Sequence, residues 1–278
     1  MYELFLTAPV AEDDFGAACA VLSGLCNMPP WETIHRVLYF QGPSRPVGLS
    51  VHSSIDKRLA NTLQLWRELH QNFARQSFVL QARYEVFKDR DMGPTAAPMD
   101  LDALPGILKW TDFPDPPRGQ PLLTQRKKVE IWDQRKLPSV LRDNQNQFKT
   151  ETIEEIYHFF RDDVEFTLTK QYFVQPIEEY IPFDKRQQLG QPRDILPAWD
   201  SLTPVDLQNR WIFQVKAHVL QDNQPEEIRK VQEQLLAIRT ELEGLFDFRP
   251  IDRKVHDTRV AQRPQGVQAL PQRVTIDK

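Results

Sequence analysis

Two-residue alternation of apolar and polar side chains is the feature of this sequence that most limits the folds open to it. The segment Asn209–Leu220 has apolar side chains at every second position: Trp211, Phe213, Val215, Ala217 and Val219. The same period runs through residues 78–86 and 164–172. Because successive side chains of a β-strand point to opposite faces, each segment is expected to be a strand with one apolar face.

Further strands and three helices complete the predicted set of elements. Strands are expected at residues 2–8, 33–42, 126–133, 152–160 and 245–260, which makes about eight in all. Apolar residues recur with helical spacing at residues 15–26, about 56–75 and 225–242. Since so many alternating strands must hide their edges, we expect an α+β fold: a multistranded antiparallel β-barrel or strongly curled sheet with flanking helices.

Two proline-rich stretches interrupt this pattern. Residues 92–121 contain seven prolines and residues 175–204 form a second such stretch. Prolines at this density break helices and central strands, so both stretches are predicted to be surface excursions. The expected organisation is a single barrel domain over residues 1–260 and a flexible tail over residues 261–278.

Large apolar side chains within these excursions are candidates for contact with a partner protein. They are Leu108, Trp110, Phe113 and Trp199. Aromatic residues dominate the energetics of protein interfaces, so exposed residues of this kind are candidate anchors. The alternative is that they seal the ends of the barrel.

Composition and cysteine usage narrow the class of protein. With 35 basic and 39 acidic residues, the net charge is −4, which argues against a direct partner among nucleic acids.

Cys19 and Cys26 are seven residues apart on one helix face, about 10 Å along its axis, too far for a disulfide. Free thiols indicate a reducing compartment. The opening residues MYELFLTAPV lack the features of a signal peptide, and no apolar run of ~18 residues predicts a membrane helix.

Motifs for common catalytic and cofactor sites are missing from the sequence. The six histidines form no HExxH pair, and neither cysteine belongs to a CxxC motif. No GxxxxGK[ST], GxGxxG or GxSxG sequence occurs. We therefore expect no catalytic residues, no bound cofactor and no metal.

The strongest enzymatic alternative is a metal-dependent phosphohydrolase of the triphosphate-tunnel kind. Such a barrel needs acids at positions i and i+2 of inward-facing strands, with basic groups opposite to bind phosphate. Glu130 is followed two residues on by Trp132, and Glu165 by Thr167. We therefore expect these acids, with Glu3, to be a solvated face. Convergence of several acids inside the barrel, with basic groups opposite, would favour the enzyme, whereas an apolar interior would exclude it.

Three blocks of sequence resemble the family of Mediator complex subunit 18. In chain order they are LKWTDFPDPP followed by TQRKKVEIWDQRKLPSVLRDN, then ETIEEIYHFFRDDVEFTLTKQYF, then GLFDFRPIDRKVHDTRV. The resemblance extends from the first residues to about Val260. It implies a barrel distantly like the triphosphate tunnel but without catalysis. It also implies a nuclear scaffold of the Mediator head module that supports RNA polymerase II transcription, pairs with Mediator subunit 20 and holds a C-terminal helix of Mediator subunit 8.

Overall fold

The computed structural model describes residues 1–50, 60–117, 119, 121–174, 191–220 and 223–261. The strands are β1 (Tyr2–Val10), β2 (Trp31–Gln41), β3 (Val79–Glu85), β4 (Gly106–Thr111), β5 (Thr124–Gln134), β6 (Gln147–Arg161), β7 (Val164–Phe173), β8 (Thr203–Pro204) and β9 (Trp211–Val219). The α-helices are α1 (Phe15–Cys26), α2 (Ala60–Phe73), α3 (Lys88–Asp91), α4 (Leu137–Asp143) and α5 (Pro225–Glu241). Short 3-10 turns are η1 (Glu12–Asp14), η3 (Trp199–Ser201) and η4 (Arg253–His256).

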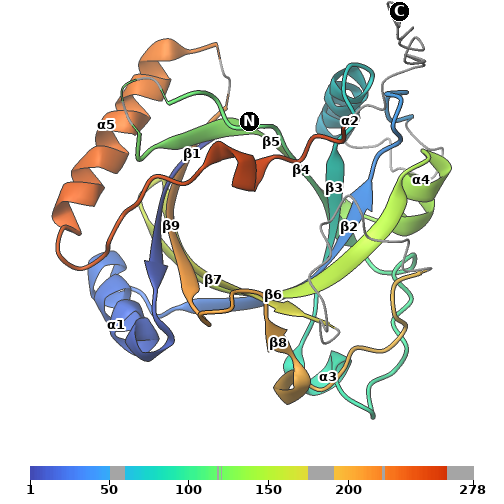
Figure 1. The fold of residues 1–278 in the computed structure, drawn as a ribbon, viewed down its shortest axis with the longest axis horizontal. Coiled ribbons are helices and arrows are strands. Elements are labelled where there is room, and N and C mark those ends of the chain that lie inside the picture. Colours follow the sequence, from blue (N-terminus) through green and yellow to red (C-terminus); the bar gives the residue numbers. More distant parts are fainter. Residues whose placement is uncertain (51–59, 118, 120, 175–190, 221–222, 262–278) are drawn as a thin grey trace, which may run out of the picture.

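The strands form a closed antiparallel barrel, which Figure 1 shows end-on. Around the barrel the order is β6-β2-β3-β4-β5-β1-β9-β7, and β7 pairs again with β6. The two-residue β8 pairs with the end of β7. Closure leaves these eight strands without a free edge, which removes the tendency of sheets to add a further strand. The expectation of a closed antiparallel barrel with flanking helices is confirmed.

The pairing of β6 with β7, which form a hairpin, closes the barrel. Ten residue pairs join the two strands, from Thr152 opposite Phe173 to Arg161 opposite Val164. Asp162 turns the chain with a φ of 51°, a left-handed conformation that Asp tolerates better than most residues. The acidic residues of the segment 152–173 therefore divide between the turn and the two strand faces, as the sequence indicates.

Most apolar residues of the long strands pack on the outside of the barrel against helices. Figure 1 shows α1 and α5 on one side of the barrel and α2 and α4 on the other. Helices α1 and α5 cover β1, β7 and β9, where Leu4 and Phe213 are fully buried. Helices α2 and α4 cover the strands from β2 to β5, where Trp66 and Trp110 are buried. Each amphipathic helix thus contributes its apolar stripe to a core on the outside of the barrel.

A third, smaller core lies outside β2 and β6 beneath the loops that include α3 and η3. Arg36 is fully buried there, and its Nε and Nη2 donate hydrogen bonds to Glu151 Oε2 at 2.9 and 2.6 Å. Its Nη2 also donates to the Arg193 carbonyl oxygen at 2.5 Å. This bonding attaches residues 191–199 to the outside of the barrel, because a buried guanidinium left without partners would be costly.

The prediction for residues 92–121 is wrong in part. The prolines flank a short strand, β4, which begins after Pro105 and ends before Pro114. No proline therefore removes a hydrogen bond from its ladder. The expectation that Leu108 and Trp110 are exposed is also wrong, because their exposed fractions are 0% and 1%.

The C-terminal segment also differs from its expectation of an extended strand. Residues 245–260 make one isolated bridge, between Phe78 and Arg259, and cross one end of the barrel. Parts of other expectations lie outside the described residues: the start of the second helix at 56–59, residues 175–190 of the second excursion, and the tail from 262 to 278.

Both cysteines are free and half-buried, and both pack against the core beneath α1. Burial raises the pKa of the thiols of Cys19 and Cys26. Among the helices of the described ranges, none combines the length and apolarity that a membrane crossing requires.

Replacing Trp110 should test the outer core. Trp110→Ala removes a buried ring that packs at centroid distances of 5.2 Å from Phe78 and 6.2 Å from Phe73. We expect the free energy of unfolding in urea to fall by about 3–5 kcal/mol. The control is Trp132→Ala, since Trp132 is 60% exposed; it should change the free energy by about 0.5 kcal/mol or less. Equal losses in the two variants would contradict this description of the core.

Candidate functional site

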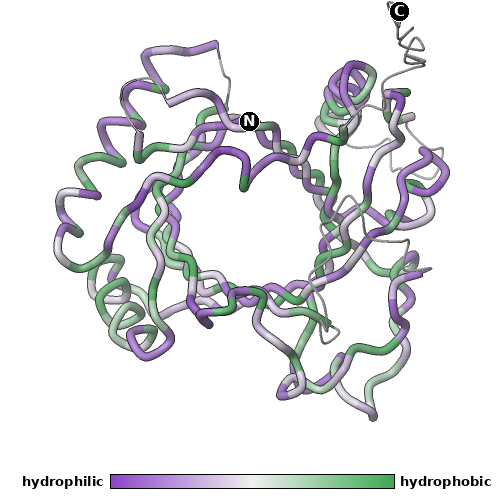
Figure 2. The backbone as a smooth tube through the Cα atoms, in the orientation of Figure 1, coloured by the Kyte–Doolittle hydropathy of each residue, from purple (hydrophilic) through white to green (hydrophobic). Residues whose placement is uncertain are grey.

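The interior of the barrel is lined by polar and charged side chains. Since the apolar faces point outward to the helices, alternation turns the remaining side chains inward. In Figure 2 the strands accordingly change repeatedly between hydrophobic and hydrophilic colours along their length. We name the inward charged residues the inner charge belt; they are Glu3, Arg83, Lys109, Arg126, Lys128, Glu130, Glu154, Glu165 and Lys216.

One part of the inner charge belt joins β1, β4 and β5. Arg126 Nε lies 3.0 Å from Glu3 Oε2, and Lys128 Nζ lies 3.3 Å from Glu3 Oε1. Lys128 Nζ is also 3.3 Å from Glu130 Oε1, and Lys109 Nζ is 3.6 Å from the same oxygen. Two carboxylates, those of Glu3 and Glu130, therefore form ion pairs with three cations in this part of the barrel.

The other part of the inner charge belt consists of carboxylates with partners on neighbouring strands. Arg83 donates to Glu154 Oε2, and Gln171 Nε2 donates to Glu154 Oε1 at 3.0 Å. Glu165 lies 2.8 Å from His158 Nδ1 and 3.6 Å from Lys216 Nζ. The basic partners of Glu165 lie on the two adjacent strands, β6 and β9, whereas Arg83 reaches Glu154 from β3, past the intervening β2.

The cations hold the buried acids in their charged form. Burial alone would raise the pKa of Glu154, but Arg83 and then Lys109 overcome it and lower the pKa to about 2. The pKa values of Glu3 and Glu165 are likewise lowered against the effect of burial, chiefly by Arg126 for Glu3 and by Lys216 for Glu165. Burial and the nearby Arg83 lower the pKa of His35 to about 4, so its imidazole is neutral at pH 7.

The expectation that the strand acids form a solvated face is wrong. Glu3 and Glu154 are only 3% and 8% exposed, and Glu130 and Glu165 also point into the barrel. Barrel closure converts the polar face of each strand into an interior surface. One sequence signal could have revealed that these acids are buried. A basic and an acidic residue occupy successive positions on the polar face of the same strand, as Lys128 and Glu130 do.

The charged interior has the arrangement that would favour the phosphohydrolase, since acids converge inside the barrel with basic groups opposite. The acids converge inside the barrel, but each one already has a basic partner within salt-bridge distance. Across the described ranges, no group of three or more His, Cys, Asp or Glu side chains is placed to hold a metal ion. The interior therefore has the charges of a phosphate tunnel without a set of free acidic ligands.

The two ends of the barrel differ. At one end, which we call the cavity mouth, a cavity of about 970 Å³ reaches inward to Arg83, Lys109 and Arg126. Residues 205–210 and 251–258 line its outer part. The C-terminal segment is bonded across this end, since Val79 N donates to the Thr258 carbonyl oxygen at 2.7 Å and Arg249 N donates to the Thr7 carbonyl oxygen at 3.1 Å.

At the opposite end, aromatic side chains are exposed; we call this end the aromatic mouth. Trp31 lies at the start of β2, Trp132 near the end of β5 and Phe160 near the end of β6, and antiparallel pairing brings these strand ends together. Their exposed fractions are 57%, 60% and 41%. The rings of Trp31 and Phe160 are 6.4 Å apart, and His158 stacks on Phe160 with centroids 6.2 Å apart.

The four predicted anchor residues are not brought together. Leu108 and Trp110 are buried beneath α2. Phe113 is partly buried between Arg253 and Arg259, whose guanidinium carbons lie 4.3 and 3.9 Å from the ring centroid. Trp199 in η3 is also partly buried, with its ring 5.2 Å from that of Tyr172 and 4.1 Å from Lys88 Nζ. The exposed Trp31, Trp132 and Phe160 were not among the predicted anchors.

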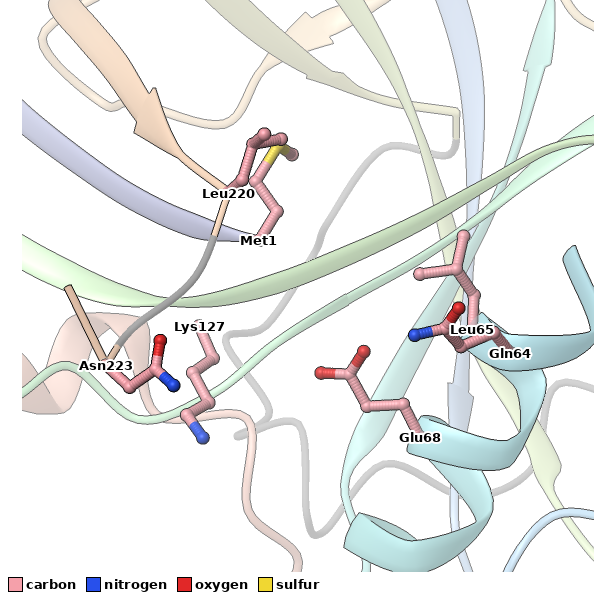
Figure 3. A pocket seen from close by; sticks show the side chains of 7 residues that line it. All are labelled: Met1, Gln64, Leu65, Glu68, Lys127, Leu220 and Asn223. Atoms are coloured by element: carbon pink, nitrogen blue, oxygen red, sulfur yellow. The ribbon is translucent and has the colours of Figure 1, made fainter. Parts of the chain in front are cut away.

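A smaller pocket lies on the outside of the barrel beside α2 (Figure 3). Its volume is about 410 Å³, and its lining residues are Met1, Gln64, Leu65, Glu68, Lys127, Leu220 and Asn223. Figure 3 shows Glu68 and Lys127 reaching into it from opposite sides. Leu220 is 83% exposed, so this pocket combines one acidic and one basic side chain with accessible apolar surface.

Comparison with solved structures shows the same fold in Mediator. A chain of the Schizosaccharomyces pombe Mediator head module superposes with a TM-score of 0.60 at 15% identity, covering 89% of this chain and 98% of that chain. The PH1819 protein from Pyrococcus horikoshii has a TM-score of 0.41 at 10% identity, with coverage of 90% and 94%. A putative adenylyl cyclase from Hippeastrum, described as having a dominant triphosphatase activity, has a TM-score of 0.36 at 10% identity, with coverage of 90% and 90%.

Comparison of the sequence with curated proteins gives no match. A sequence model of the Med18 protein family, however, matches residues 2–259, which is nearly the whole chain. The chain therefore belongs to the Med18 protein family and is a non-catalytic subunit of Mediator, a nuclear complex that regulates transcription by RNA polymerase II.

Proposed function

We propose that the protein is a scaffold of the Mediator head module, whose barrel pairs with Mediator subunit 20 and holds the C-terminal helix of Mediator subunit 8. The main support for this proposal is the aromatic mouth, where large apolar rings are exposed at the ends of strands. The resemblance of the sequence to its family supplies the identity of the two partners.

Exposed tryptophans at strand ends are suited to binding a protein. A tryptophan or phenylalanine side chain buries about 150–250 Å² when covered, and such residues are enriched among those that dominate binding energy. Trp31 is paired with His158 on β6, and Trp132 lies at an irregular step of β5 between the paired residues Ile131 and Gln134. The backbone at both positions is therefore ordered before association, which lowers the entropy lost on binding. The described part of the chain covers these rings only in part, which leaves 57% of Trp31 and 60% of Trp132 accessible to a partner.

The inner charge belt supports a structural role rather than a chemical one. Its acids are ionised and paired with bases of the barrel strands, so they are committed to the barrel itself. Buried ion pairs contribute little net stability, but mispairing them is costly, which favours a single strand register. We infer that the belt specifies how the strands align and thereby where the aromatic rings are placed.

Co-expression with Mediator subunits 8 and 20 tests the proposal. The wild-type chain should elute with both subunits in size-exclusion chromatography. In the double variant Trp31→Ala/Trp132→Ala, we expect the affinity for at least one subunit to fall by a factor of about 30 or more, since each hot-spot tryptophan contributes about 2 kcal/mol or more. Binding measured separately to each subunit would show which one contacts the aromatic mouth.

The matched control is Leu207→Ala, because Leu207 is fully exposed at the cavity mouth. This variant should bind as the wild type does. Phe113→Ala and Trp199→Ala, assayed in the same way, test the two accessible anchors predicted from the sequence. A wild-type chain that elutes alone with both subunits present would contradict the scaffold proposal.

Acid should destabilise the barrel through the inner charge belt. The pKa of Glu154 is about 2 in the folded chain, against about 4.3 for an unperturbed Glu. Between these pH values the unfolded chain binds more protons than the folded chain. The contribution of Glu154 to the free energy of unfolding should therefore be complete above about pH 4.5 and decrease as the pH falls towards 2. Urea unfolding at pH 7, 4 and 3 measures this dependence.

Glu154→Gln is the comparison variant for the acid experiment. It removes the titrating carboxyl while leaving a hydrogen-bond acceptor of similar shape. It should be less stable than wild type at pH 7 and lose less stability between pH 4.5 and 3. Identical pH dependence in the two proteins would show that the pairing of Glu154 contributes nothing to acid sensitivity.

A further inference from the structure

The cavity mouth contains a set of basic and hydroxyl groups that the scaffold role does not require. Arg83, Lys109 and Arg126 reach the cavity from three adjacent strands, β3, β4 and β5. The volume of about 970 Å³ lies at the upper end of the range of about 300–1,000 Å³ typical of small-molecule sites. The cavity is open to solvent, so a soluble ligand can enter it.

The charges of the barrel interior do not balance. The described part of the inner charge belt contains four acids, Glu3, Glu130, Glu154 and Glu165, and five Lys or Arg side chains. Glu154 pairs with Arg83, and Glu165 pairs with Lys216 and also lies beside His158. The remaining two acids, Glu3 and Glu130, are shared among three cations, which leaves a surplus of one positive charge within the inner charge belt. Three acids also line the cavity, Glu154, Asp206 and Asp257, and they are paired with Arg83, Arg210 and Arg259 respectively.

The surplus of positive charge acts on Lys109, whose pKa is lowered. Burial is the largest cause that lowers its pKa, the neighbouring Arg83 and Lys128 lower it further, and the final value is about 8. Glu130 on β5 and Glu3 on β1 raise it, but they are shared with other cations. A buried ammonium surrounded in this way is stabilised by any anion that enters beside it.

Two unpaired polar atoms also line the cavity. Thr7 is only 5% exposed, and its Oγ1 has no hydrogen-bond partner among the described residues. His256 Nε2 is likewise buried and unpaired, with its ring 5.6 Å from that of Phe5 inside the barrel. Buried polar atoms are seldom left unsatisfied, so these groups indicate a hydrogen-bonding ligand.

We propose that the cavity mouth binds a small oxyanion with two or more negative charges, held by Lys109, Arg83 and Arg126 and hydrogen-bonded by Thr7. Guanidinium groups and hydroxyls match the oxygens of a phosphate or of a polycarboxylate. The site binds this ligand without transforming it, because the acids around it are paired with bases. Binding at this end leaves the aromatic mouth free for protein partners.

Isothermal titration calorimetry on the full chain tests the site with sulfate, phosphate, pyrophosphate and citrate, at constant ionic strength set with chloride. Wild-type protein should bind at least one of these anions at a single saturable site. Tighter binding of pyrophosphate would identify a phosphate ligand, and tighter binding of citrate a polycarboxylate. Failure of all four to bind at millimolar concentration would overturn the proposal.

Variants of two lysines locate the binding. Lys109→Met should weaken anion binding by a factor of ten or more. Lys216→Met is the matched control, since it removes another inward lysine that does not line the cavity and whose partner, Glu165, keeps its contact with His158. Its binding should match wild type. Unchanged binding in Lys109→Met, or equal loss in both variants, would refute the assignment.

Two further measurements hold even if Lys109→Met fails to fold. Thr7→Val removes only an unpaired hydroxyl and should keep the fold while weakening anion binding several-fold. Sulfate keeps its charge between pH 7 and 9, whereas Lys109 loses its proton around pH 8, so sulfate affinity should fall by about tenfold over this range. Full affinity in Thr7→Val together with a flat pH profile would overturn the proposal.

Discussion

The pairing of charges inside the barrel is the interaction on which the rest of the structure depends. The apolar face of each strand is turned outward under a helix, so the opposite face must be enclosed when the barrel closes. Enclosed charges are tolerated only when opposite charges face them. Glu154 beside Arg83, and Glu3 between Arg126 and Lys128, meet this condition across strand boundaries. A shift of one residue in register would separate these pairs and expose the outer apolar face.

This pairing of charges distinguishes the barrel from an enzyme whose interior contains similar charged residues. An acid can bind a metal or transfer a proton only if its oxygens are available, and the carboxylates of the inner charge belt already have basic partners. Membership of the Med18 family agrees with this reading. The charges stay inside as a structural feature, while the exposed groups that can act on other molecules lie at the two ends.

The two ends of the barrel offer different chemistry. The aromatic mouth presents Trp31, Trp132 and Phe160 to solvent, which suits contact with a protein surface. The cavity mouth presents a surplus of positive charge within a partly enclosed volume, which suits a small anion. Arg36 and Glu151 lie outside the barrel wall and attach residues 191–199 there, so this segment is held by a separate buried ion pair.

The sequence by itself determined most of the strands, the main helices and the choice of an antiparallel barrel, because periods of two and of 3.6 residues are local properties of the chain. Its strand prediction for residues 245–260 was wrong, since that segment makes only an isolated bridge. The sequence also determined the family, through blocks of similarity in a fixed order. It could not show β4, since a six-residue strand between prolines has little periodic signal. Only the tertiary structure decided which strand face was inside: alternation marks Glu130 and Glu165 as polar, and both solvent and a charged interior accept polar residues. Exposure of Trp31 and burial of Trp110 were decided in the same way, because each depends on which helix or strand end lies beside it and not on the neighbouring sequence.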